Sequence, residues 1–215
     1  MGAEVKKELK YFYIDGRPGW DQERFEDPDM NGGGCAAVTA CDLCICLARD
    51  KGLGELYPFD PFNVTAKDYV AFSKIMRPYL YPRSRGIDTL GLYLAELSAY
   101  WSDRGARYMK GEELTGESDV REARELIVSQ IENGILVPCL LLKHKDPVFD
   151  DFEWHWFNIS GYEMREDGFY IEAVTYADTH WFSLERLWDT GYEEKGGLVK
   201  ISFGENRANN RNEIP

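Results

Sequence analysis

The first half of the chain places its apolar residues at helical spacing. Between residues 36 and 51, small and apolar side chains recur every three or four positions, and the charged residues are confined to the end of the segment. Gly52 follows at the position where a helix commonly stops. We therefore expect a buried helix here that other elements can approach closely. Further helices are expected over residues 67–75, 88–104 and 118–133.

The pattern changes after Gly134, where short apolar and β-prone runs alternate with turn-prone segments. The expected strands are 135–144, 155–163, 169–176 and 197–203. Helices followed by an antiparallel sheet predict an α+β fold and argue against a doubly wound nucleotide-binding fold. We expect one domain over residues 1–204, with 55–118 as a possible helical insertion that restricts access to a cleft. An asparagine-rich disordered tail is expected over 205–215.

Composition and net charge limit the classes of partner that the chain is expected to bind. The chain has 215 residues, 44% of them hydrophobic, which is the balance of an ordinary folded domain. Its 25 Lys and Arg against 38 Asp and Glu give a net charge of −13, so neither nucleic acid nor an anionic membrane is an expected partner. No apolar run is long enough to span a bilayer, and the N-terminal residues lack the core of a secretory signal. We expect a cytoplasmic protein with reduced thiols; its oligomeric state is left open.

Cys35 stands where a reactive thiol is expected. It follows Gly32, Gly33 and Gly34 and comes directly before the first long helix. The free N–H groups at a helix N-terminus stabilise a thiolate, and glycines let a substrate carbonyl approach the sulfur. A flexible glycine turn before a helix that happens to begin with Cys is the plain alternative. Spacing alone leaves both open.

A cysteine nucleophile needs a base and a group that orients the base. His155 opens an expected strand, whereas His144 ends one and His180 lies in an expected turn, so His155 is the best-placed base. Asp178 follows the next antiparallel strand and is expected to return to the level of His155. Together, Cys35, His155 and Asp178 favour an enzyme over a non-catalytic domain.

Several segments carry a resemblance to a known family. GGGCAAVTACDLCICLA resembles the nucleophile helix of papain-like cysteine peptidases, most of all the branch similar to the double-glycine leader peptidases that process bacteriocin precursors. Three further segments resemble that branch's segments around the histidine and the aspartate, namely ELIVSQIENGILVPCLLL, HWFNISGYE and VTYADTHWFSLERLW. The matches cover roughly residues 30–50 and 120–203.

The resemblance implies a papain-like fold and a thiol-dependent hydrolase of peptide or amide bonds. Cys35 would be the nucleophile, His155 the general acid and base, and Asp178 the residue that orients the imidazole. It implies a peptide or amide substrate and no metal or organic cofactor. A catalytically inactive binding module on the same frame, and an acyltransferase or transglutaminase-like enzyme with the same triad, are the alternatives.

One departure concerns the oxyanion hole, the group of donors that stabilises the negative oxygen of the intermediate. The family usually has a glutamine a few residues before the nucleophile, but this chain has Asp29 six residues before Cys35. A carboxylate there would repel the oxyanion. Gln22 is the expected replacement, with Asn31 as the nearer amide. A second departure is Ala36–Ala37 in place of the Gly–Pro that often follows the nucleophile.

Other polar clusters have simpler interpretations. Cys41, Cys44 and Cys46 lack a fourth zinc ligand and do not share one helical side, so we expect them to be buried hydrophobic residues. The acidic segment 150–153 precedes His155 and is expected to favour the charged imidazole. If it lines the cleft, substrates with basic residues near the scissile bond would be preferred.

Overall fold

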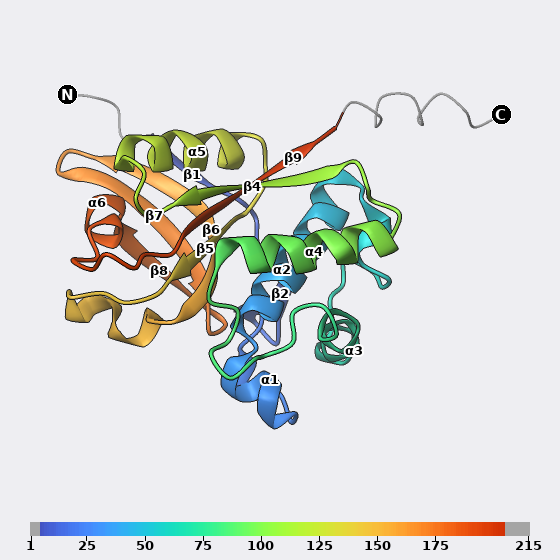
Figure 1. Cartoon of the computed structure of the whole chain (residues 1–215). Coiled ribbons are helices and arrows are strands. Elements are labelled where there is room, and N and C mark those ends of the chain that lie inside the picture. Colours follow the sequence, from blue (N-terminus) through green and yellow to red (C-terminus); the bar gives the residue numbers. More distant parts are fainter. Residues whose placement is uncertain (1–4, 205–215) are drawn as a thin grey trace.

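The computed structural model of the chain describes residues 5–204, which fold into a mixed α+β arrangement (Figure 1). The expected tail 205–215 lies outside these residues. Within the described part, a seven-stranded antiparallel sheet has the order β4-β9-β5-β6-β7-β8, and β1 pairs with β6 beside this path. Its strands are β1 (Val5–Glu8), β4 (Met109–Thr115), β5 (Val137–Leu141), β6 (His155–Arg165), β7 (Gly168–Thr175), β8 (Asp178–Ser183) and β9 (Gly197–Phe203).

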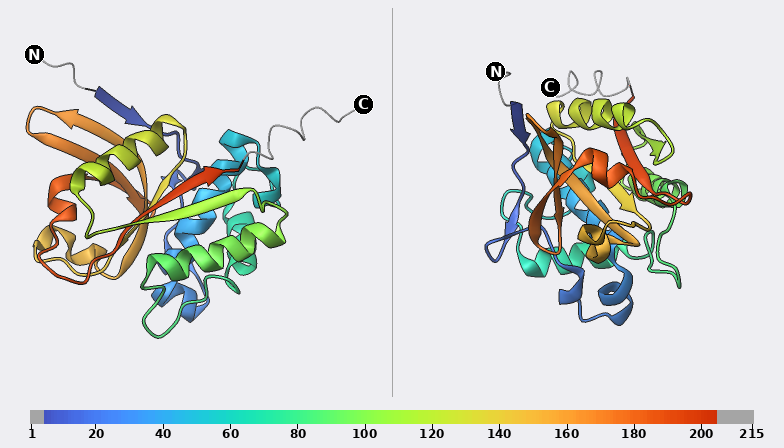
Figure 2. Two further views of the ribbon diagram at one scale, coloured as in Figure 1. Left: turned by 45° about the horizontal axis from the view of Figure 1, so that its top comes forward. Right: turned by 90° about the vertical axis from the view of Figure 1, so that its left-hand side faces the viewer.

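Helices cover both faces of the sheet. They are α1 (Pro28–Gly33), α2 (Cys35–Lys51), α3 (Ala66–Met76), α4 (Leu90–Asp103), α5 (Val120–Glu132) and α6 (Leu184–Trp188). Short 3₁₀ turns are η1 (Gln22–Arg24), η2 (Gly54–Leu56) and η3 (Pro147–Phe152), and β2 (Tyr13–Ile14) pairs with β3 (Arg17–Pro18) in a separate small hairpin. Figure 2 shows α2, α3 and α4 gathered on one side of the molecule and β6 and β7 on the other, while β4 and β9 extend across to α4.

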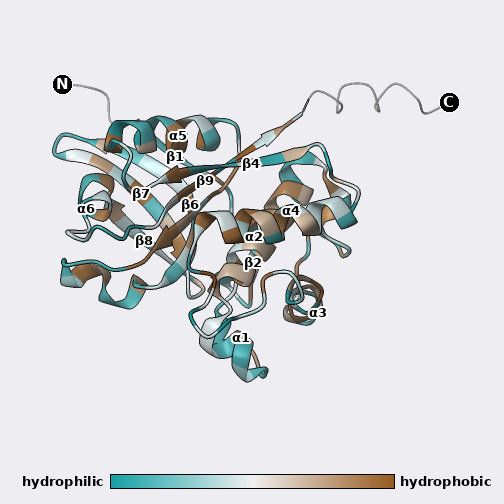
Figure 3. Ribbon diagram, in the orientation of Figure 1, coloured by the Kyte–Doolittle hydropathy of each residue, from teal (hydrophilic) through white to brown (hydrophobic). Residues whose placement is uncertain are grey.

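Two apolar clusters form because the side chains of the central strands alternate between faces. On β6, Trp156 joins the cluster around α2, α3 and α4, whereas Phe157 and Ile159 join the cluster under α5 and α6. Leu140 and Cys139 on β5 divide in the same way. Figure 3 shows the apolar residues concentrated on α2 and the strands, and a hydrophilic α1. The central strands β5 and β6 are thus buried on both faces.

The expected helices and strands are present, with small shifts at their ends. The long helix α2 ends at Gly52, whose φ of 65° is the left-handed conformation expected of a helix stop. Thr89 caps α4 by accepting a hydrogen bond from the N–H of Leu92, and Asp119 caps α5 by accepting one from the N–H of Arg121. Local sequence therefore predicts these boundaries well.

Segment 55–118 differs from the expected helical insertion. It contributes α3 and α4, but its last part is β4, which pairs with β9 along its whole length and forms an edge of the main sheet. Gly111 on β4 leaves room for the side chain of Leu94 on α4. The segment is therefore built into both the core and the sheet. Within the described residues, no helix is long and apolar enough to cross a membrane.

Candidate functional site

A cavity of about 580 Å³ lies at the Cys35 end of α2. One side is formed by Gln22 from η1 and by Gly32 and Gly33 from α1. Cys35 and His155 line it together, with Tyr176 beyond the histidine and the loop 83–87 opposite. Elements far apart in the sequence thus bring a thiol, an imidazole and a carboxamide to one space of the size that binds small molecules or peptide segments.

The glycines before Cys35 have a role other than the expected one. Gly32 and Gly33 belong to α1, and neither they nor Gly34 has a positive φ. Gly34 joins α1 directly to α2, and a Cβ atom there would overlap the carbonyl oxygen of Met30. The absence of a side chain at Gly34 is therefore a packing requirement, and it lets α2 begin at Cys35 itself.

Cys35 is held as a neutral thiol in this state. Its side chain is buried, with 8% of the residue exposed, and burial raises its pKa. The main-chain N–H groups of Trp156, Ala36 and Cys35 itself, near the sulfur, act against this rise in pKa. Trp156 is the residue that follows His155 on β6.

His155 is also neutral at physiological pH. The residue is 4% exposed, and desolvation by burial lowers its pKa to about 4. The expectation that the acidic segment 150–153 would favour the charged imidazole is therefore corrected, because burial outweighs those carboxylates. Glu153 directs its carboxylate to the main-chain N–H of His144, at 2.5 Å, rather than to His155.

The imidazole of His155 is fixed by two neighbours at the end of β7. Its Nε2 makes a 2.7 Å hydrogen bond with the hydroxyl of Thr175. The ring of Tyr176 stacks on it with centroids 4.5 Å apart and an interplanar angle of 12°, and the Tyr176 hydroxyl lies 3.3 Å from Nδ1. The same hydroxyl donates to the carbonyl oxygen of Asp151. The ring is thus held by one in-plane hydrogen bond and one stacked face.

Asp178 does not take the place expected of it. It is exposed, and its carboxylate accepts a hydrogen bond from the N–H of Thr179; among the described residues, no hydrogen bond joins it to His155. The reason is the turn between β7 and β8, which has only two residues, so that Thr175 pairs with Asp178. Asp178 therefore opens β8, one strand farther from β6, and Thr175 contacts the imidazole instead.

The residues around this turn have strained main chains. Tyr176 and Ala177 have φ values of 52° and 53°, and Trp154, directly before His155, has a φ of 52°. Two positive φ values in a two-residue hairpin turn normally call for Asn and Gly. Non-glycine residues in this conformation cost energy and are concentrated at functional sites. This strain adds weight to His155 and Tyr176 as functional residues.

Of the two amide residues considered for the oxyanion hole, Gln22 lines the cavity and Asn31 does not. Its Nε2 donates a 3.1 Å hydrogen bond to the carbonyl oxygen of Asn31, which leaves a second N–H on the same nitrogen. Asn31 uses its own amide to hold the carbonyl oxygens of Glu23 and Phe25. Asn31 is thus a support for the η1–α1 segment.

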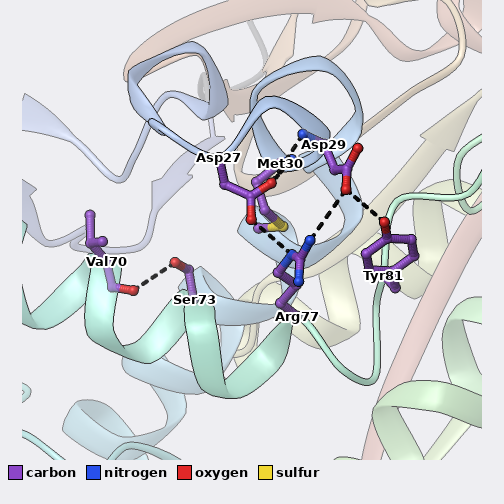
Figure 4. A network of polar contacts seen from close by, with 7 residues as sticks. All are labelled: Asp27, Asp29, Met30, Val70, Ser73, Arg77 and Tyr81. Atoms are coloured by element: carbon purple, nitrogen blue, oxygen red, sulfur yellow. Dashed lines mark hydrogen bonds and ion pairs between the residues drawn. The ribbon is translucent and has the colours of Figure 1, made fainter.

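Asp29 is turned away from the cavity, so the anticipated repulsion of an oxyanion does not arise. Its carboxylate accepts a 2.6 Å hydrogen bond from the Tyr81 hydroxyl and pairs with Arg77 at 3.2 Å (Figure 4). Arg77, at the end of α3, also pairs with Asp27. One guanidinium thus holds both the N-cap residue of α1 and Asp29 in its first turn.

Sequence reasoning did not identify Thr175, Tyr176 or the loop 83–87. The loop is fastened to β6 because the indole N–H of Trp156 donates to the carbonyl oxygen of Ile87 at 2.6 Å. It brings Arg83 and Arg85 to the cavity, whereas Glu153 is the acidic residue among the lining residues. The preference for basic substrates, which rested on an acidic cleft, loses its basis. The sequence did contain an indication for Thr175 and Tyr176, because they end the strand that is expected to lie beside the strand of His155.

The other thiols and histidines lie elsewhere. Cys41, Cys44, Cys46 and Cys139 are buried and free, and burial raises the pKa of each. His144 accepts a hydrogen bond from the N–H of Asp146 and contacts the carbonyl oxygen of Arg186. In the part of the chain that the structure describes, no group of three or more His, Cys, Asp or Glu residues could hold a metal ion.

Comparison with known proteins gives no match, whether to a family model, to a curated protein or to a solved structure.

Proposed function

We propose that the chain is a papain-like, thiol-dependent hydrolase of peptide or amide bonds, in which Cys35 attacks the substrate carbonyl. The observation that carries this proposal is that Cys35, at the first position of α2, shares one cavity with the buried imidazole of His155. A thiol at a helix start and a base that line the same cavity are the groups that acyl transfer through a thioester requires.

The neutral resting state defines the order of events. His155 takes the proton from Cys35 as the sulfur bonds to the carbonyl carbon, and then gives it to the leaving amine. Water, activated by the same imidazole, hydrolyses the thioester and releases the acid. Thr175 is a positioning residue for the ring, and Gln22 donates its free N–H to the developing oxyanion.

A second candidate is a binding module that keeps the cavity without the chemistry. The observation in its favour is electrostatic, because burial raises the pKa of Cys35 and lowers that of His155, which opposes a resting thiolate–imidazolium pair. An acyltransferase with the same residues differs from a hydrolase only in the acceptor that resolves the thioester.

Turnover of a library of short peptides and amides tests the proposal. We expect the wild-type chain to release product and Cys35→Ser to lose turnover, with Cys139→Ser as the matched control because Cys139 is buried in the cluster on the other face of the sheet. Added hydroxylamine distinguishes transfer from hydrolysis by trapping the acyl group as a hydroxamate. Equal product release by wild type and Cys35→Ser would contradict a thiol mechanism.

A further inference from the structure

A second cavity, of about 550 Å³, lies between α3 and the η1–α1 segment. Trp20, Phe25, Met30 and Val70 supply an apolar lining, and all but Val70 are buried. Figure 4 shows Met30 on α1 and Val70 on α3, with Arg77 paired to Asp27 and Asp29. The volume is that of a site for a drug-sized molecule, and the apolar lining suits an apolar body.

The indole of Trp20 forms part of the wall of this cavity. Trp20 is 4% exposed, stacks on Tyr69 with centroids 5.0 Å apart, and has the guanidinium of Arg24 over its ring at 4.2 Å. Its Nε1 is buried and has no hydrogen-bond partner among the described residues. Because the ring lines the cavity while its N–H is covered, the indole N–H signal reports on what occupies the cavity without being a ligand contact itself.

The rim of the cavity is cationic in a chain of net charge −13. Four basic side chains line it, namely Arg24, Lys67, Lys74 and Arg77, against the acidic Glu26 and Asp27. Arg24 pairs with Asp15, and Arg77 with Asp27 and Asp29. Lys67 and Lys74 are seven residues apart on α3 and therefore lie on the same side of the helix. Within residues 5–204, neither lysine forms an ion pair.

We propose that this cavity binds an organic anion with an apolar body, such as a medium-chain carboxylate. The apolar part would contact Phe25, Met30 and Val70, and the carboxylate would lie at the lysine rim. Two features support this ligand class: the apolar lining and the two lysines that no carboxylate of the described chain neutralises. The site is separate from the cavity of Cys35, so the proposal does not depend on catalysis.

Titration with sodium octanoate, followed by ¹H–¹⁵N spectra of the full chain, tests the proposal. The indole N–H signal of Trp20, assigned with Trp20→Phe, should move on binding, while that of Trp156, whose donor is already used, should not. Octanol tests the need for charge and acetate the need for an apolar body. We expect both to bind more weakly than octanoate.

The variants separate recognition from folding. Lys67→Gln with Lys74→Gln removes two exposed charges and should weaken octanoate binding about fivefold, whereas Lys110→Gln on β4 should leave it unchanged. Val70→Trp should abolish binding by filling the cavity. The proposal fails if octanol binds as well as octanoate, if the lysine variants bind octanoate normally, or if octanoate moves no signal of Trp20 at millimolar concentration.

Discussion

At the scale of single residues, the hydrogen bond between His155 and Thr175 decides how the imidazole is oriented. A hydroxyl carries no charge, so it fixes the ring without stabilising an imidazolium, in keeping with the lowered pKa of His155. A carboxylate in this place would do both. Thr175 therefore orients a neutral base, and Asp178 has no comparable contact.

Thr175→Val should lower kcat by about tenfold with little change in KM, because it leaves a buried ring nitrogen without its partner, a loss equivalent to about 1.4 kcal/mol. Thr175→Ser should restore most of the activity. Steady-state kinetics on a substrate found in the library provide the measurement. Asp178→Asn is the control and should behave as wild type; a large loss in that variant would return the orienting role to Asp178.

The sequence predicts part of this site and misses the rest for identifiable reasons. Cys35 and His155 follow from their places at the starts of a helix and a strand. The sequence does not point to Thr175, because the tight turn formed by Tyr176 and Ala177 lacks the Asn or Gly that usually marks such a turn. Asp178 was therefore expected to follow the strand beside His155, whereas it opens the next strand, β8. The neutral state of both catalytic candidates depends on burial, which neighbouring charges in the sequence do not reveal.

At the scale of elements, the direct junction of α1 and α2 is what places Cys35 at a helix start. Asp27 caps α1 by accepting from the N–H groups of Asp29 and Met30, and the N–H of Gly34 donates to the carbonyl oxygen of Met30. The two helices are thus continuous in the chain but distinct in direction (Figure 1). A side chain at Gly34 would have to separate them.

Gly34→Ala should lower the free energy of unfolding by about 1–3 kcal/mol, the usual cost of forcing an extra carbon into a packed site. Gly32→Ala is the matched control, because nothing lies within 4 Å of a Cβ there. In α1 it should be neutral or stabilising by up to about 1 kcal/mol. Urea denaturation of both variants gives the comparison. Equal stability of the two variants would show that the junction tolerates a side chain.

The sequence predicted the helices and strands that have a clear hydrophobic pattern or clear residues at their ends. The helices α2, α4 and α5 have apolar faces with clear boundaries, and β5 and β6 are apolar runs. The missed strands of the main sheet were β1, whose residues are all exposed, β4, whose polar residues lie at a sheet edge, and β8, which begins directly after an unrecognised turn. These strands are specified by pairing with β6, β9 and β7, which local sequence does not encode.

At the scale of the whole molecule, a buried carboxylate joins three parts of the fold. Asp42 on α2 accepts hydrogen bonds from the hydroxyls of Tyr11, 2.8 Å away, and of Tyr69 on α3, 2.6 Å away. Asn158 on β6 donates to the same tyrosine, Tyr11, at 3.4 Å. Burial raises the pKa of Asp42 to about 7 despite these donors. This network ties the N-terminal segment to the helix that carries Cys35.

Asp42 should make stability fall as pH rises from about 4 to about 7. In that window the folded carboxyl, with its raised pKa, keeps its proton, whereas the unfolded one, with a pKa of 3.8, has lost it. Asp42→Asn does not titrate, so its free energy of unfolding relative to wild type should improve between pH 4 and pH 8, by up to about 4 kcal/mol. Urea denaturation at both pH values measures this, with the exposed Glu117→Gln as control. A pH-independent difference would contradict the raised pKa.

The central claim is that Cys35 and His155 act as a nucleophile and base in one cavity. Acetylation by p-nitrophenyl acetate, located by peptide mass spectrometry between pH 5 and pH 8, tests it most directly, and the four other cysteines serve as internal controls. The account predicts that Cys35 is acetylated first, at a rate nearly constant over this range because His155, with a pKa of about 4, stays neutral. His155→Ala should be slower by about 100-fold or more and should gain about tenfold per pH unit, as a thiolate alone does. Acetylation of Cys35 no faster than that of Cys139, or unchanged by His155→Ala, would contradict the account.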